Sequence, residues 1–158
     1  MPVKQFADTN ILLYAYDNEQ VSKRQKAISI VGAGMTQLGT IAISVQVLQE
    51  FYVNYLKKGG TKPQARQIVE DLSHWPVVDN SRELLGHALV LSERWQISLW
   101  DAGILAAAFA SGATELLTED LNHGQDYGGV RVLNPFLRLL QRLGFGRRKQ
   151  SGSFRGRL

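Results

Sequence analysis

The sequence contains no cysteine, which excludes a disulfide framework and any metal site built on thiolates. Long hydrophobic runs are also missing, because the most apolar stretch, residues 104–110, is far too short to cross a bilayer. At the N-terminus, MPVKQFADTN puts Asp8 where the apolar core of a secretory signal would have to continue. These absences lead us to expect a cytoplasmic protein without membrane association.

Sequence motifs of several large enzyme classes are absent as well. There is no GxxxxGK[ST] phosphate loop, and the GAG at residues 32–34 does not continue into GxGxxG. No GxSxG or cysteine–histidine nucleophile pattern occurs, and the three histidines lack the spacing of a zinc site. No phosphate-loop or nucleophile motif therefore competes with chemistry that is based on carboxylates.

The excess of basic over acidic residues comes from one end of the chain. The 158 residues carry a net charge of +4, but five of the 18 basic residues lie in the last fifteen, so 13 basic residues face 14 acidic ones in the rest. We predict one domain over residues 1–143 and a basic, flexible tail over 144–158 that includes Arg147, Arg148 and Lys149. The tail is compatible both with binding phosphate backbones and with a purely solubilising role.

Short apolar strands alternate with helices along the chain. Strands are predicted at 3–7, 40–44, 76–79, 114–118 and 130–134, and helices at 19–31, 45–58, 61–75, 81–95 and 98–112, with a last helical segment at 135–143. The first long helix is expected to end where Gly32 and Gly34 begin. This alternation predicts an α/β fold with a central, mostly parallel sheet covered by helices on both faces.

Three acidic residues fall where the strands of such a sheet end. Asp8 follows the first strand directly, Asp120 comes after the 114–118 strand with Glu119 between, and Asp101 lies in the first turn of a helix that begins at Ser98. The carboxyl ends of parallel strands share one edge, so these side chains can converge there. Each also has a purely structural interpretation, as a helix cap for Asp8 and Asp101 and as turn residues for Glu119 and Asp120.

Glu50 lies in the 45–58 helix, whose pattern points away from a site. The apolar stripe of that helix is predicted to contain Leu48, Tyr52, Tyr55 and Leu56, and Glu50 lies off it. Periodicity alone indicates a solvated glutamate.

Clustered carboxylates suit Mg²⁺ or Mn²⁺, which prefer hard oxygen ligands. Such ions activate water and stabilise the charge that develops during phosphodiester cleavage. The sequence thus favours a metal-dependent phosphodiesterase over a zinc enzyme.

Four blocks of the sequence together resemble a known family. FADTNILLYAYD, ISVQVLQEFYVNY, SLWDAGILAAA and LLTEDLNHGQDYGGVRVLNPF, which lie between about Val3 and Leu140, are similar to the PIN-domain ribonucleases. The likeness is greatest to the toxin component of VapBC toxin–antitoxin systems. The resemblance implies a PIN-like fold.

The resemblance also implies a set of site residues. Asp8, Glu50, Asp101 and Asp120 would be the catalytic and metal-binding acids, and Thr9, Asn10, Ser98 and Thr118 would be auxiliary polar groups. The Thr-x-Asp spacing favours Asp120 and leaves Glu119 dispensable. His123 is open to several interpretations, as a residue that orients the loop, a substrate contact, a turn cap or a solvated side chain. Arg147, Arg148 and Lys149 would be weak substrate contacts.

The function implied by the resemblance is an endoribonuclease that uses Mg²⁺ or Mn²⁺, the toxin of a type II pair. Partners would be RNA, a small antitoxin and a second copy of the chain in a homodimer. A groove for the antitoxin would draw on Tyr14, Tyr16, Phe51, Tyr52, Tyr55 and Leu56, which are equally compatible with ordinary core. The alternatives are a non-catalytic RNA- or protein-binding module on the same fold, and an aspartyl phosphotransferase with Asp8 as nucleophile, for which the first block lacks a second acid.

Overall fold

The protein is built on one parallel sheet. The computed structural model describes residues 2–137. In this part of the chain, five short strands lie in the order β3-β2-β1-β4-β5, and every pair is parallel. Their bounds are β1 Gln5–Ala7, β2 Ile41–Ser44, β3 Val77–Val78, β4 Glu115–Leu117 and β5 Arg131–Leu133. All five predicted strands are confirmed, and each carboxyl end lies at the same edge of the sheet.

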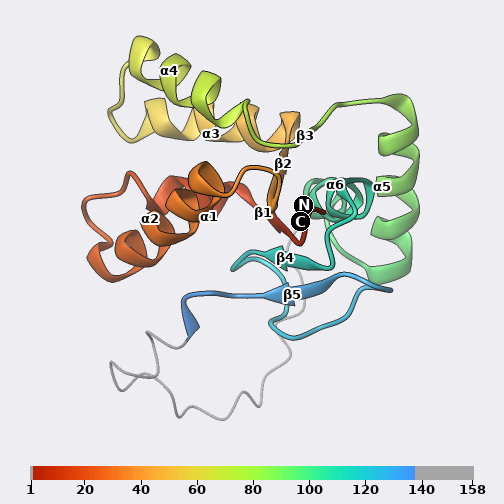
Figure 1. The fold of residues 1–158 in the computed structure, drawn as a ribbon. Coiled ribbons are helices and arrows are strands. Elements are labelled where there is room, and N and C mark those ends of the chain that lie inside the picture. The colour runs from red at the N-terminus through yellow and green to blue at the C-terminus, as the bar shows by residue number, and fades with distance from the viewer. Residues whose placement is uncertain (1, 138–158) are drawn as a thin grey trace.

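Within residues 2–137, six helices cover the sheet. They are α1 Thr9–Tyr14, α2 Val21–Thr36, α3 Val45–Lys57, α4 Lys62–Leu72, α5 Arg82–Trp95 and α6 Leu99–Ser111. Helix α6 lies against the strands β1 to β4 and pairs with α5, whereas α1 packs on α2 and α3, and α3 packs on α4. Figure 1 shows α1 to α4 on one side of the sheet and α5 with α6 on the other. The predicted α/β fold with both faces covered is confirmed.

Most helices begin at a side chain that caps the free backbone N–H groups. Asp8 caps α1, Ser44 caps α3 and Ser98 caps α6, in each case directly by a side-chain oxygen. Thr61 and Gln64 form a reciprocal capping box at α4. Because Asp8 directly follows β1 and Ser44 is the last residue of β2, the turn from strand to helix is short, and this brings helix starts to the edge where the strands end.

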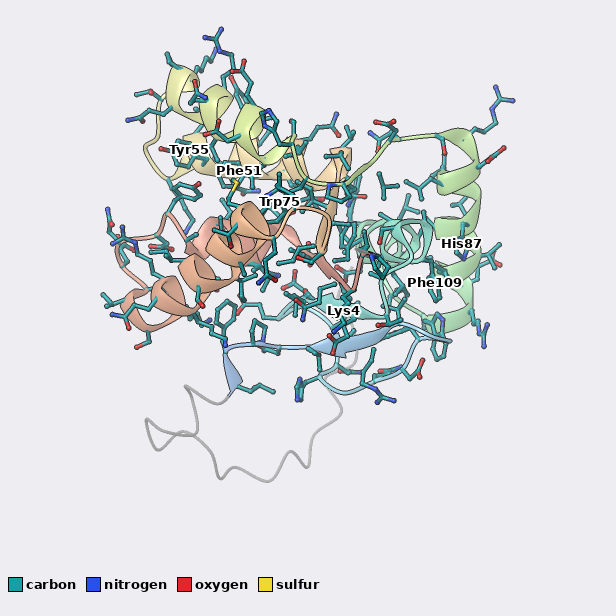
Figure 2. The ribbon with its side chains drawn as sticks, viewed as in Figure 1. Lys4, Phe51, Tyr55, Trp75, His87 and Phe109 are labelled. Atoms are coloured by element: carbon teal, nitrogen blue, oxygen red, sulfur yellow. The ribbon has the colours of Figure 1, made fainter. Side chains whose placement is uncertain are left out.

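Helix α6 and the aromatic side chains of α3 are two large parts of the core. Between Ala102 and Ala108, α6 is buried almost without interruption. On the other side Phe51 is fully buried and stacks on Tyr55, with ring centroids 5.6 Å apart. Figure 2 shows Phe51 and Tyr55 between α3 and α1, and His87 beside Phe109 between α5 and α6. Within residues 2–137 no helix combines the length and the apolar character needed to cross a bilayer.

The apolar stripe of α3 is centred differently from the prediction. The buried residues of this helix are Val47, Leu48 and Phe51, whereas Tyr52 and Leu56 are only partly buried. Of the four predicted stripe residues, Leu48 is buried, and Tyr55 is partly buried and packs against the core, whereas the centre of the stripe lies at Val47, Leu48 and Phe51. The cause is that α3 is covered on two sides, by α1 and by α4, so its buried face is wider than a single stripe.

Helix α2 is longer than the sequence indicated. It runs through Gly32 and Gly34 to Thr36, so the prediction that these glycines end it is wrong. The physical reason is a close contact with a core side chain. A Cβ atom on Gly34 would lie 2.3 Å from Cζ2 of Trp75, which is itself buried. Only a residue without a side chain lets α2 pack this closely against Trp75.

This contact yields a prediction with a matched control on the same helix. Gly34→Ala is expected to lower the free energy of unfolding by about 1–3 kcal/mol, because Trp75 or the helix must move. Gly32→Ala, where the added Cβ meets nothing within 4 Å, is expected to raise it by roughly 0.5–1 kcal/mol through helix propensity. Urea denaturation of both variants measures this, and equal effects at the two sites would contradict the close-contact explanation.

The predicted helical segment at 135–143 lies mostly outside the described residues, as do the predicted domain end at 143 and the basic tail. Within the described part, Phe136 is fully buried and its ring meets Tyr14 edge-on at 5.1 Å. The chain therefore still contributes to the core beyond β5.

Candidate active site

Asp8 is held at the carboxyl end of the central strand β1 by two hydrogen bonds. Its Oδ1 accepts from the backbone N–H of Thr9 at 2.7 Å, and its Oδ2 accepts from the hydroxyl of Thr118 at 2.8 Å. The residue is only 5% exposed. The predicted capping role of Asp8 is confirmed, and the second bond shows that the carboxylate does more than cap α1, because it also joins the end of β1 to the end of β4.

Thr118 connects three of the predicted site residues. This fully buried hydroxyl donates to Asp8 and accepts from the backbone N–H of Asp120 at 3.1 Å and from Nδ2 of Asn10 at 3.3 Å. Asn10 Nδ2 also donates to Oδ2 of Asp120 at 3.1 Å. In contrast, Oδ1 of Asn10 is buried and has no partner among the described residues. A buried carbonyl oxygen without a donor indicates that a further group or water completes this site.

Glu50 is directed to the same edge from α3. Its Oε2 accepts from the hydroxyl of Thr9 at 2.8 Å, and its Oε1 accepts from Nε2 of Gln46 at 2.8 Å. Glu50 is partly buried, so its interpretation as a solvated glutamate is wrong. Periodicity failed here because the side of α3 that lies off the apolar stripe faces α1 and α6 rather than solvent. Gln46, one turn earlier on the same face, is a site neighbour that the sequence reading missed.

Asp101 reaches this edge from the first turn of α6. Ser98 caps that helix by accepting from the backbone N–H of Asp101 at 3.1 Å, which is half of the predicted capping box. Asp101 itself is partly buried. Four chain segments, at 8–10, 46–50, 98–101 and 118–120, thus meet at the carboxyl edge of the sheet.

We call Asp8, Glu50, Asp101 and Asp120 the carboxylate cluster, because their charges act on one another. Burial raises the pKa of Asp8 to about 7, against the lowering effect of the hydrogen bonds from Thr118 and Thr9, and the charges of Asp120 and Glu50 add to the rise. Desolvation also raises the pKa of Asp101, with further contributions from Asp120 and Glu50. The pKa of Asp120 is raised by desolvation and by the charges of Glu119 and Glu50, against the hydrogen bond from Asn10.

A family model for the PIN domain matches residues 6–125, about three quarters of the sequence. The chain belongs to the PIN domain family. The match contains every member of the carboxylate cluster and lies inside the predicted domain 1–143, whose boundary stays a prediction. Comparison with curated protein sequences gives no match.

Several solved structures share this PIN fold. A toxin–antitoxin complex from Klebsiella pneumoniae is 26% identical, with a TM-score of 0.59 over 84% of this chain and 98% of that one. VapBC2 from Rickettsia felis, bound to a DNA fragment from its promoter, is 22% identical, with a TM-score of 0.61 over the same shares of the two chains. VapC20 from Mycobacterium tuberculosis, described as a toxin that cleaves the sarcin–ricin loop, is 17% identical, with a TM-score of 0.58 over 74% and 92%.

The donor set of this PIN domain suits a hard divalent cation. The cluster offers only carboxylate oxygens, together with the unpartnered Oδ1 of Asn10, and Mg²⁺ prefers such ligands. The side chains are nevertheless not arranged as a preformed metal site. Within residues 2–137, no three histidine, aspartate or glutamate side chains are grouped so that they could hold an ion. The residues therefore fit Mg²⁺ or Mn²⁺ in chemistry, and ion binding would require the carboxylates to move closer together.

Glu119 faces away from the cluster toward α1 and α2. Tyr14 donates its hydroxyl proton to Oε1 of Glu119, and Nζ of Lys23 lies 3.0 Å from Oε2. The ammonium of Lys23 also lies 4.7 Å from the centroid of the Tyr14 ring. Because the carboxylate of Glu119 is engaged by these two side chains, the prediction that Asp120 is the acid directed into the site agrees with the geometry. No sequence signal links Lys23 to Glu119, because the two are 96 positions apart.

The Lys23–Glu119 pair gives a second prediction for the PIN domain. Lys23→Met is expected to lower the free energy of unfolding by about 1–2 kcal/mol, since it removes a partly buried ion pair and a cation–π contact. Lys26→Met is the matched control, because Lys26 is exposed on the same helix. Chemical denaturation of both variants measures the difference, and a loss in Lys26→Met as large as that in Lys23→Met would refute the pair's contribution.

His123 has a structural contact at this edge. Its Nδ1 accepts from the backbone N–H of Asn134 at 3.0 Å, which ties the loop after β4 to the residue that follows β5. The ring therefore orients the loop, one of the roles considered for it, and its contact with substrate stays a prediction. Arg147, Arg148 and Lys149 lie outside the described residues.

Proposed function

We propose that this PIN domain is a Mg²⁺- or Mn²⁺-dependent endoribonuclease and acts as the toxin of a type II toxin–antitoxin pair. The observation that carries the proposal is the carboxylate cluster, in which acids from four chain segments lie at one edge of the sheet, where burial and neighbouring charges raise the pKa of Asp8, Asp101 and Asp120. Burying mutually repelling carboxylates costs stability, which a bound cation would offset. The activity of VapC20, described as a toxin that cleaves the sarcin–ricin loop, supports RNA as the substrate class.

In the proposed mechanism the chain positions a cation, the scissile phosphate and a water. Asp8, Asp101 and Asp120 would hold the ion, and Glu50 would complete the shell or orient the attacking water. When bound, Mg²⁺ or Mn²⁺ would supply Lewis-acid stabilisation of the phosphate and a more acidic water. Thr118 and Asn10 hold Asp8 and Asp120 in position through their hydrogen bonds. Water would attack phosphorus in line, leaving a 5′-phosphate and a 3′-hydroxyl.

The test is cleavage of RNA by the purified chain. We expect cleavage of single-stranded RNA or of a structured stem–loop with MgCl₂ or MnCl₂ present, complete loss with EDTA, and recovery when the ion is returned. End-specific ligation and phosphatase sensitivity identify a 5′-phosphate and a 3′-hydroxyl. Absence of cleavage with both metals, over a range of RNAs and pH values, would contradict the proposal.

A second candidate is a non-catalytic RNA- or protein-binding module on the same fold. It is favoured by one observation, the absence of a preformed metal geometry among the described residues. Gel-shift binding of RNA by a chain that never cleaves it with added Mn²⁺, and no thermal stabilisation by Mn²⁺, would support this alternative over the nuclease.

Two protein partners belong to the proposal, an antitoxin and a second copy of the chain. The toxin–antitoxin complex from Klebsiella pneumoniae and VapBC2 from Rickettsia felis support an antitoxin. Of the residues considered for its groove, Phe51 is buried in the core, whereas Tyr16 is 39% exposed and packs edge-on to Tyr55. For the homodimer, Leu89 and Val90 offer exposed apolar surface on α5. Light scattering should give twice the chain mass of 17.6 kDa.

A further inference from the structure

Trp100 is exposed beside the carboxylate cluster. Its relative exposure is 70%, the highest among the exposed large hydrophobic residues of the described chain. It directly precedes Asp101 in the first turn of α6. An indole gains much from burial, so a tryptophan left in solvent at a candidate active site indicates a ligand that covers it.

A pocket of 510 Å³ adjoins this side chain, and we call it the Trp100 pocket. Its lining includes the apolar residues Leu84, Leu99 and Trp100 itself. It also includes the polar residues Gln46, Asn80 and Arg82. Its volume falls in the usual range for small-ligand sites, about 300–1,000 Å³. The combination of a flat aromatic face with amide and guanidinium donors suits a planar, polar-edged ring next to a negative charge.

Gln46 joins this pocket to the carboxylate cluster. Its Nε2 donates to Oε1 of Glu50 at 2.8 Å and to the backbone carbonyl of Trp100 at 3.1 Å. The amide lies so close to Gly103 on α6 that a Cβ there would be 2.5 Å from Oε1 of Gln46. A glycine at this position therefore permits Gln46 to bridge α3 and α6, so the same side chain lines the pocket and contacts an acid of the cluster.

We propose that the Trp100 pocket takes one unstacked nucleobase of single-stranded RNA, stacked on the indole next to the scissile phosphate. This inference rests on the proposed ribonuclease function and adds a residue that selects unpaired RNA. Stacking on an aromatic side chain tolerates every base, because each base has a π-face. Arg82 contributes a positive charge at the pocket for the adjoining backbone phosphate.

The kinetic test compares Trp100→Ala and Trp100→Phe with Leu38→Ala, a control that removes an exposed apolar side chain between α2 and β2, outside the pocket. For a single-stranded RNA with Mg²⁺, Trp100→Ala is expected to raise KM about tenfold, with the larger effect on KM than on kcat. Trp100→Phe should recover most of the affinity because it keeps a π-face, and Leu38→Ala should match the parent.

A spectroscopic test reports the stacking itself. RNA that contains 2-aminopurine is titrated with the cleavage-deficient Asp101→Asn chain in Mg²⁺, and its fluorescence should be quenched on binding. The quench should disappear when Trp100→Ala is added to this chain and return with Trp100→Phe. Light scattering of each variant reports whether the change alters the oligomeric state.

The outcomes separate the two proposals. Failure of the parent to cleave RNA with either metal contradicts the proposed ribonuclease function. The fluorescence titration then still tests whether the Trp100 pocket binds a base. Cleavage with the same KM and the same quench in Trp100→Ala overturns the pocket while the nuclease stands. A fall in molecular mass in Trp100→Ala would mean that a second copy covers the indole, and it would also overturn the proposal.

Discussion

Asp101→Asn is expected to reduce RNA cleavage at least about a hundredfold, since even the loss of partners that only orient metal ligands costs about 10–100-fold. The substitution removes one negative charge from the carboxylate cluster and changes the size of the side chain very little. Ser98 accepts from the backbone N–H of residue 101, a bond that asparagine keeps, so α6 should still begin normally. The measurement is the single-turnover rate with saturating Mn²⁺, together with circular dichroism to verify the fold.

Asp71→Asn is the matched control for this experiment. Asp71 lies on α4, where its carboxylate accepts from Gln67 at 3.0 Å and is exposed, so neutralising it removes the same charge away from the cluster. Its cleavage rate should equal that of the parent. If Asp101→Asn cleaved as fast as Asp71→Asn, Asp101 would have no part in the chemistry and the assignment of the cluster would be wrong.

Asp8→Asn is expected to stabilise the metal-free protein at pH 8. Burial raises the pKa of Asp8 from 3.8 to about 7, so between pH 4 and pH 7 the folded state keeps a proton that the unfolded state has lost. The parent should therefore lose stability as the pH rises through this window, by up to about 4 kcal/mol, because one pKa unit corresponds to about 1.4 kcal/mol. Asparagine carries no such charge, although it accepts less well from Thr9 and Thr118.

Thermal unfolding in EDTA at pH 4 to pH 8 measures this effect. At pH 8 the Tm of Asp8→Asn should exceed that of the parent by at least about 3 °C, and the difference should shrink toward pH 4. With added Mn²⁺ the parent should have the higher Tm, because the carboxylate at position 8 binds the cation and asparagine does not carry the charge for it. If the Tm values of the two proteins changed in parallel with pH across this range, the raised pKa of Asp8 would be contradicted.

Local signals in the sequence predicted the elements of the fold well. The strands are short apolar runs, and the starts of α1, α3 and α6 carry Asp8, Ser44 and Ser98, whose capping contacts are local and so readable without tertiary information. The end of α2 was misread for the opposite reason. In the sequence, Gly34 is typical of a helix end. In the structure it lies inside α2, because Trp75, a distant residue, occupies the space that a side chain at position 34 would need.

The candidate site divides in the same way. Asp8, Asp101 and Asp120 were found by position, because strand ends and helix starts of a parallel sheet share an edge. The periodicity of its helix predicted that Glu50 lies outside the site. Only the resemblance to PIN-domain ribonucleases predicted it as a site residue. The contacts of Glu50 with Thr9 and Gln46, and the engagement of Glu119 by Lys23 and Tyr14, depend on which helices pack together.

By itself, the sequence determined the alternation of strands and helices, the acids at their junctions and the absence of thiolate, zinc and phosphate-loop chemistry. The tertiary structure decided which way each acid faces, that Glu50 joins the cluster and Glu119 does not, and that Trp100 remains in solvent beside it. The physical reason is that secondary structure and capping arise from neighbours in the chain, whereas burial, and with it the raised pKa of Asp8, depends on segments up to 110 positions apart.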